Sequence, residues 1–278
     1  MKTVLLFTFA LFCLIACTKG GKSHAKEETY VFPDKTVIHN IEADACLEGK
    51  SGEWVQTGKQ VEESLLNTFA GEITPQMQKE AGDEFDKEIR QQFHLAEKSH
   101  KHWKKLKSIF NEVKQHAERT DIEYQVFLLE DSLLNAFTIP GGNVYVTTKL
   151  MDFVQSDDEL AVILGHEIGH NENKHTLKHL QKLSVAQKFL GDDWGKLGAT
   201  ILDILTLPYG QPQELESDRA GVYLAYEAGF NPEKGTDFFD RINDGKQRGD
   251  MERFLSTHPF PGERSACLKK YLQRCKAH

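Results

Sequence analysis

The stretch SDDELAVILGHEIGH, residues 156–170, predicts a buried helix and decides the fold around it. Ser156 and Glu159 stand three positions apart, which is the pattern of a capping box at a helix N-terminus. The apolar run 160–164 follows directly, so we expect the helix to begin near Ser156 and to lie in the core. His166 and His170 come later in the same stretch and are therefore expected on this helix.

The two histidines have the spacing of a metal-binding pair. Residues four apart on a helix differ by about 6 Å along the axis and by about 40° around it, so His166 and His170 project from one face. Two neutral imidazoles placed in this way can bind one Zn²⁺. Glu167 lies about 100° further round the helix and can reach a water molecule beside the metal, as a general base would. The sequence therefore predicts the active-site helix of a zinc-dependent hydrolase.

A catalytic zinc ion needs a third protein ligand and one open position. A histidine six residues after His170 would be typical of another class of zinc peptidases, but Thr176 stands there. We therefore expect the third ligand on a second helix, whose start Pro212 favours. Glu214 in its first turn is the predicted ligand. Asp218 follows one turn later on the same face and is predicted to hydrogen-bond a ligand histidine.

Other interpretations of these residues stay open. The acidic turn around Glu214 is also what a solvated helix N-terminus favours through the helix dipole. Glu216 is the alternative third ligand. His175 and His179 follow the histidine pair by one or two turns, and we interpret them as packing or surface residues.

The rest of the chain predicts an α+β fold that is mostly helical. Residues 122–129 and 144–147 are rich in β-branched and aromatic side chains, and they flank a Pro-Gly-Gly turn within residues 135–142. This pattern predicts a small sheet beside the active-site helix. Upstream, apolar residues recur at helical spacing from about residue 59 to residue 118, with an expected break at 71–82.

The first residues are typical of a bacterial lipoprotein signal. Lys2 precedes an apolar run at 4–16, which as a helix would span about 20 Å and is too short for a hydrocarbon core of roughly 30 Å. The run ends at Leu-Ile-Ala before Cys17, which resembles a lipobox, so we expect a signal peptide at 1–16 and a lipid on Cys17. A plain secretory signal is the alternative. We expect a flexible tether at 17–40 and one catalytic domain at 41–278.

Secretion would place the remaining cysteines in a compartment that permits disulfides. Cys267 and Cys275 lie on a predicted helix at 262–275, about 12 Å apart along its axis, which is too far for a bond between them. A disulfide would therefore join Cys46 to one of the two. Three unpaired thiols are the alternative.

Charge and composition exclude some classes of partner. The net charge of −8 argues against binding to nucleic acid and against membrane binding through a polybasic patch on anionic lipid. The 39% of hydrophobic and 27% of charged residues are ordinary for a soluble globular protein.

Four groups of residues, taken together, resemble family forty-eight of the metallopeptidases, which includes the CAAX prenyl endopeptidases and periplasmic proteases of outer-membrane assembly. The groups are Asn135-Ala136-Phe137 with Pro140-Gly141-Gly142; Glu159-Leu160-Ala161 with His166-Glu167-Ile168-Gly169-His170 and His175; Glu214 to Asp218 with Arg219-Ala220-Gly221; and Ser256-Thr257-His258-Pro259 with Arg264. Residues 209–212, and Lys174 in place of arginine, depart from the family pattern.

The resemblance implies a zincin-like domain of the gluzincin type and a zinc-dependent endopeptidase. His258 and Arg264 would stabilise the tetrahedral oxyanion, or His258 would cap the zinc in a resting state. Asn135, Ala136 and Phe137 would form a strand that pairs with an extended substrate.

The expected substrates are unfolded or misassembled proteins of the bacterial envelope, cleaved for quality control. Thr18 after the lipidated cysteine indicates the periplasmic face of the outer membrane. The alternative is a zinc-stabilised chaperone or assembly factor with little proteolysis.

Overall fold

The computed structural model describes residues 28–32, 73–190, 208–243, 254–259 and 261–277, with side chains 183–190 left out. The elements in chain order are α2 (Pro75–Gln92), α3 (Trp103–Lys114), β1 (Gln125–Leu129), β2 (Ala136–Thr138), β3 (Asn143–Thr147), α4 (Thr148–Phe153), α5 (Asp157–Glu172), α6 (His175–Leu190), α8 (Gln211–Glu227), α9 (Pro232–Gly235), α10 (Asp237–Asn243) and α12 (Pro261–Cys275). The expected mostly helical α+β fold with a small sheet is confirmed.

The sheet has the strand order β1-β3-β2, with β1 parallel and β2 antiparallel to β3. β2 and β3 are joined by the predicted glycine turn, in which Gly141 and Gly142 have φ of 85° and 91°. Positive φ carries little penalty only for glycine, which explains these residues at the turn. The order leaves β2 at one edge of the sheet.

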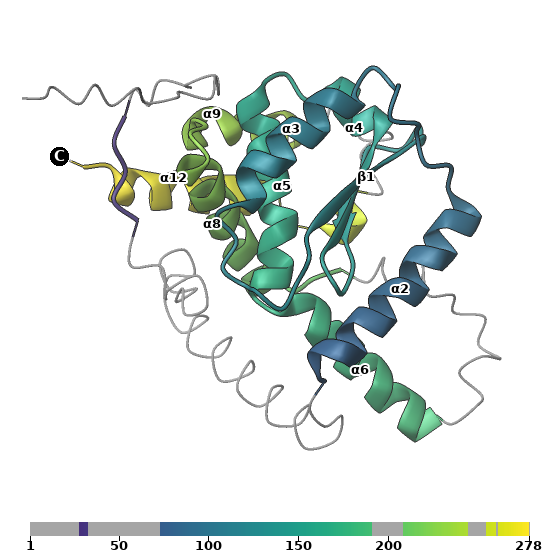
Figure 1. The fold of residues 1–278 in the computed structure, drawn as a ribbon. Coiled ribbons are helices and arrows are strands. Elements are labelled where there is room, and N and C mark those ends of the chain that lie inside the picture. The colour runs from purple at the N-terminus through teal and green to yellow at the C-terminus, as the bar shows by residue number, and fades with distance from the viewer. Residues whose placement is uncertain (1–27, 33–72, 191–207, 244–253, 260, 278) are drawn as a thin grey trace, which may run out of the picture.

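The two faces of the sheet pack on different helices. Val126, Leu128 and Val144 belong to the main core with residues of α3 and α5. On the opposite face Phe127, Tyr145 and Phe137 form a stack, with ring centroids 5.2 and 5.0 Å apart, and belong to a second cluster with residues of α2. Figure 1 shows α2 on one side of the strands and α3 and α5 on the other.

The helices α5 and α8 lie in direct backbone contact, which places the two predicted ligand segments side by side. A Cβ added at Gly165 would lie 2.7 Å from the carbonyl oxygen of Gly221, and one added at Gly221 would lie 2.8 Å from that of Val162. Only glycine permits this approach. In Figure 1, α5 runs through the centre, with the strands on one side and α8 on the other.

The helix break expected at residues 71–82 is wrong from residue 75 onward. α2 begins at Pro75, and the Thr74 side chain caps it by accepting from the backbone N–H of Met77. Gly82 lies inside the helix because the helix touches the glycine turn there: a Cβ on Gly82 would lie 2.2 Å from the Pro140 oxygen. This glycine serves a close approach and does not end a helix.

The flexible tether expected at 17–40 is wrong for residues 28–32. Tyr30 is 5% exposed, and its ring packs edge-on against Tyr226 at 5.3 Å. The backbone N–H of Val31 donates to the Cys275 carbonyl at 2.7 Å. Burial of the Tyr30 and Phe32 rings outweighs the polar composition of the segment, so this short stretch docks on α8 and α12.

The predicted signal peptide, Cys17 and Cys46 lie outside the described residues, so the lipid anchor and the disulfide stay predictions. Among the helices that the structure describes, none combines the length and the apolarity needed to cross a bilayer.

Candidate metal centre

Four side chains from three separate segments meet in one buried group. His166 and His170 come from α5, Glu214 from α8, and His258 from the segment 254–259, and each offers one donor atom within 4.8 Å of all the others. The three predicted metal ligands are thus brought together. His258, predicted for catalysis, is placed among them.

The distances between donor atoms fit a single zinc ion. Bonds of about 2.0–2.1 Å in a tetrahedron would place ligand atoms roughly 3.3 Å apart. The Nε2 atoms of His166 and His170 lie 3.0 Å apart, and His170 Nε2 lies 3.4 Å from Glu214 Oε1. His258 Nδ1 lies 3.3 Å from His166 Nε2 and 3.2 Å from Glu214 Oε2. Burial lowers the pKa of His170 well below its ordinary value, which favours the neutral imidazole that binds metals.

Asp218 holds the far side of the His166 ring, the place predicted for it. Its Oδ1 lies 2.9 Å from His166 Nδ1. Nδ1 can therefore carry the ring proton and donate a hydrogen bond to the carboxylate. This tautomer leaves Nε2 unprotonated and directed at the other donor atoms. Burial alone would raise the pKa of Asp218, but Arg264 and His166 outweigh burial and lower it.

Arg264, predicted for catalysis, lies fully buried between two carboxylates. Its Nε and Nη2 donate to Asp218 at 2.8 and 2.6 Å. Its Nη1 forms an ion pair with Glu214, although without the geometry of a hydrogen bond. Burial would raise the pKa of Glu214, yet Arg264 and His258 hold that pKa well below its ordinary value. The guanidinium therefore keeps both acids ionised in the interior.

Glu167 is the predicted general base, and its carboxylate lies beside the four donors. The residue is 1% exposed, and neither oxygen has a hydrogen-bond partner among the described residues. His258 Nε2 lies 3.5 Å from Oε1. Burial raises the pKa of Glu167, which brings it closer to the range in which a carboxylate exchanges protons near neutral pH. A buried carboxylate without a hydrogen-bond partner is costly, and a ligand or a water bound beside the donor group would satisfy this one.

His258 connects the donor group to the edge strand β2. While Nδ1 faces the donors, its Nε2 lies 3.3 Å from the Ala136 carbonyl oxygen. The backbone N–H of His258 donates to Phe254, which fixes the end of this short helical turn. A fourth protein donor closes a site that in catalysis keeps one position open.

The predicted substrate strand is β2 with the residue before it. Its Ala136 backbone lies next to the donor group, whereas the Phe137 ring turns to the α2 side of the sheet. Asn171 of α5 donates to Thr138 Oγ1 at 2.6 Å and holds the strand against the active-site helix. Asn135 is 3% exposed, and its Oδ1 has no partner within the described part of the chain.

The family model of peptidase family M48 matches residues 100–272, which is more than half of the chain and includes every residue of the donor group. The chain belongs to peptidase family M48. The resemblance inferred from the four groups of residues is thereby confirmed, and the family supports a metallopeptidase.

Curated relatives of this M48 chain come from mitochondria and from bacteria. It is 30% identical to the mitochondrial metalloendopeptidase OMA1 of Arabidopsis thaliana, over 58% of this chain and 35% of the relative. It is 23% identical to the beta-barrel assembly-enhancing protease of Yersinia pestis, over 62% and 39%. The corresponding protease of Escherichia coli K12 is 25% identical, over 54% and 35%. Each match spans well under half of the relative's own length.

The sequence did not predict the roles of three side chains around His170 in this M48 site. His175 Nδ1 lies 3.1 Å from His170 Nδ1, and Glu216 lies 2.9 Å from the other nitrogen of His175. Glu216, the alternative ligand, therefore lies behind the donor group. The Tyr209 ring stacks on His170 with centroids 3.8 Å apart. Lys174, at φ 59°, forms the turn between α5 and α6 that brings His175 back to His170, and residue spacing does not reveal such a turn.

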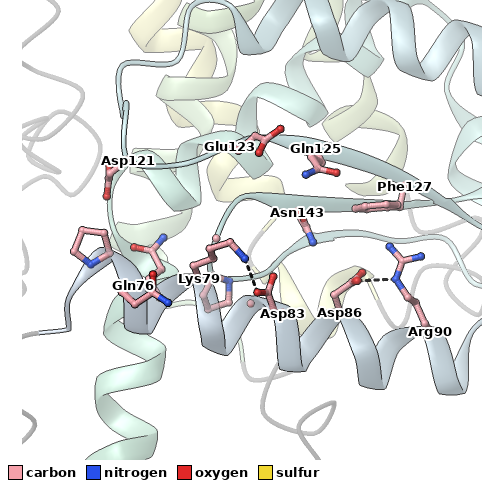
Figure 2. A pocket seen from close by; sticks show the side chains of 15 residues that line it. Gln76, Lys79, Asp83, Asp86, Arg90, Asp121, Glu123, Gln125, Phe127 and Asn143 are labelled. Carbon is pink, nitrogen blue, oxygen red and sulfur yellow. Dashed lines mark hydrogen bonds and ion pairs between the residues drawn. The ribbon is translucent and has the colours of Figure 1, made fainter.

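A separate pocket of about 530 Å³ lies between α2 and the sheet. Gln125, Phe127 and Asn143 line it, and they alternate along their strands with residues that face α3 and α5. Figure 2 shows the charged side chains of α2 at its floor, where the labelled Lys79 is paired with Asp83. The sheet thus separates this polar pocket from the donor group.

Proposed function

We propose that this M48 chain is a zinc-dependent endopeptidase in which His166, His170 and Glu214 bind Zn²⁺. The observation that carries the proposal is the buried donor group with spacings near those of zinc ligands, next to a carboxylate that has no hydrogen-bond partner among the described residues. Glu167 is that carboxylate and acts as the general base. Family membership supports the same reaction class.

Zn²⁺, when bound, lowers the pKa of water and polarises a carbonyl group. Glu167 takes the proton of the attacking water and passes it to the leaving amine. Its raised pKa suits both transfers. Asp218 orients His166 through the 2.9 Å contact at Nδ1. Arg264 acts on the site through Glu214 and Asp218, whose negative charges it stabilises.

The outer edge of β2, away from β3, is the proposed binding strand for an extended substrate, with recognition through the backbone around Ala136. His258 lies on the Ala136 carbonyl and in the donor group at once. These contacts support the capping role over the oxyanion role in the present conformation. A substrate that pairs with β2 would have to displace the His258 ring.

We propose unfolded or misassembled envelope proteins as substrates, with quality control as the purpose. Similarity to beta-barrel assembly-enhancing proteases supports this assignment. The proposed location, the periplasmic face of the outer membrane, rests on the lipobox that ends at Cys17 and on Thr18 after it. The OMA1 relatives are mitochondrial, so similarity alone does not choose the compartment.

A zinc-stabilised assembly factor is the second candidate. The observation in its favour is the fourth donor, because closed four-ligand zinc sites are typical of structural zinc. A buried carboxylate beside the donors, Glu167, favours the peptidase, since a structural zinc requires no base.

The deciding experiment compares wild-type protein with Glu167→Gln on unfolded casein, with metal content measured on the same samples. We expect one zinc per chain in both and proteolysis only in wild type. Glu123→Gln is the matched control, because Glu123 lines the pocket on the other side of the sheet. Equal, chelator-insensitive casein turnover in all three proteins would refute the peptidase assignment, and zinc without turnover would favour the assembly factor.

A further inference from the structure

The two histidines of the α5 pair are held in different ways. His166 Nδ1 faces the carboxylate of Asp218 at 2.9 Å. His170 Nδ1 instead faces a second imidazole, His175 Nδ1, at 3.1 Å. Both His170 and His175 are 0% exposed, so water does not compete for this contact.

The contact between the two rings fixes where the protons lie. Two ring nitrogens at hydrogen-bond distance need one proton between them, since two protons repel and none leaves no bond. His170 must keep Nε2 unprotonated to act as a donor to a cation. Its proton is therefore on Nδ1 and is donated to His175 Nδ1.

His175 then carries its own proton on Nε2, which faces the carboxylate of Glu216 as a hydrogen-bond acceptor. Glu216 Oε2 lies 2.9 Å from that nitrogen, and Glu216 is 6% exposed. The Ser217 hydroxyl lies 3.3 Å from His175 Nδ1, a longer contact to the nitrogen that already accepts from His170. The chain of hydrogen bonds runs from His170 to His175 to the Glu216 carboxylate.

The ring face of His170 is fixed as well. Tyr209 stacks on it at 3.8 Å with planes 23° apart, and the same tyrosine lies 4.5 Å from His179 on α6 with planes 8° apart. His175 thus holds the edge of the ligand ring and Tyr209 holds its face. The supporting residues come from α6, from α8 and from the residue just before the α8 N-cap.

We infer that His175 and Glu216 are positioning residues that set the tautomer, orientation and basicity of His170 for metal binding. This inference rests on the proposed function, since it takes His170 as a zinc ligand. Partners of ligand histidines commonly contribute 10–100-fold to metal affinity, and a carboxylate that acts through a neutral imidazole serves the same purpose.

The test measures Zn²⁺ affinity by competition with a chromophoric chelator, in wild type, Glu216→Gln, His175→Leu and the double variant. We expect affinity to fall about 10–100-fold in each single variant. The double variant should be no weaker than His175→Leu alone, because both changes break one chain of bonds. His175→Asn, which keeps an oxygen acceptor near the Nδ1 position, should restore part of the affinity.

Ser217→Ala is the matched control, because it removes a contact to the same His175 nitrogen without breaking the chain. It should bind Zn²⁺ as wild type does. Glu216→Gln nearly preserves shape, so it keeps the test decisive if His175→Leu fails to fold. Wild-type affinity in folded Glu216→Gln, with intact zinc binding by the parent, would overturn this inference alone. A parent protein that binds no zinc would overturn the proposed function and this inference with it.

Discussion

Replacement of Arg264 by methionine should strongly destabilise the metal-free protein. Arg264 is 1% exposed and is paired with Glu214 and Asp218, which are 0% and 1% exposed. Removal of one member of a buried ion pair costs about 3–5 kcal/mol of unfolding free energy, because the remaining charges lose their partner. For a folded unit of 150–250 residues this corresponds to a fall in Tm of roughly 6–20 °C.

The pH dependence of this loss follows from the pKa shifts. Arg264 lowers the folded-state pKa of Glu214 and Asp218 below their unfolded values. The stability that these acids contribute is therefore present above the unfolded pKa and is lost as pH falls through the folded pKa. The difference between wild type and Arg264→Met should be largest near neutral pH and should shrink in acid.

Thermal unfolding with EDTA and with excess Zn²⁺, at several pH values, measures these effects. Zinc should recover part of the Tm in Arg264→Met, since a bound cation compensates Glu214 and stabilises the folded state. Arg264→Lys keeps the charge but loses the bidentate contact with Asp218, so its Tm should lie between those of wild type and Arg264→Met. A Tm loss in Arg264→Met that is small and independent of pH would refute the electrostatic reasoning.

Glu167→Gln should reduce kcat/KM on casein by about 10²–10⁴-fold with zinc content unchanged, and retained turnover would exclude Glu167 as the base. In wild type, kcat/KM should fall in acid with a midpoint above the ordinary glutamate value of 4.5, because burial raises the pKa of Glu167 and only its ionised form accepts a proton. His258→Ala should raise the casein turnover rate if the ring caps the site, whereas a lower rate would assign it to the transition state. Gly221→Ala would place a Cβ 2.8 Å from the Val162 oxygen and 2.9 Å from His166 N, so it should cost about 1–3 kcal/mol in denaturant unfolding, and unchanged stability would show that the α5–α8 contact is loose.

Helical spacing was sufficient to predict the ligand segments. A four-residue interval fixes two side chains on one face whatever the surrounding fold, and Ser156 marks the start of α5 by the predicted cap, in which its hydroxyl accepts from Glu159 N–H at 3.1 Å. Glu214 and Asp218 obey the same rule on α8. The small sheet was predicted because its residues and its glycine turn are typical ones.

Contacts that depend on tertiary structure could not be predicted in the same way. His258 reaches His166 across 92 positions, and His175 returns to His170 only because Lys174 adopts a positive φ. Gly82 resembles a helix breaker until the Pro140 carbonyl is placed against it. Tyr30 lies in a polar segment, and its burial depends on aromatic partners that are distant in sequence.

The docking of residues 28–32 against the end of α12 has a mechanical consequence if Cys17 carries a lipid. Ten residues lie between Cys17 and Glu28, and the eleven steps from one to the other reach about 36–40 Å when the chain is fully extended. The tether would then keep residues 28–32, and the domain on which they dock, within that distance of the membrane surface. Only polypeptides at or near the bilayer would reach the donor group.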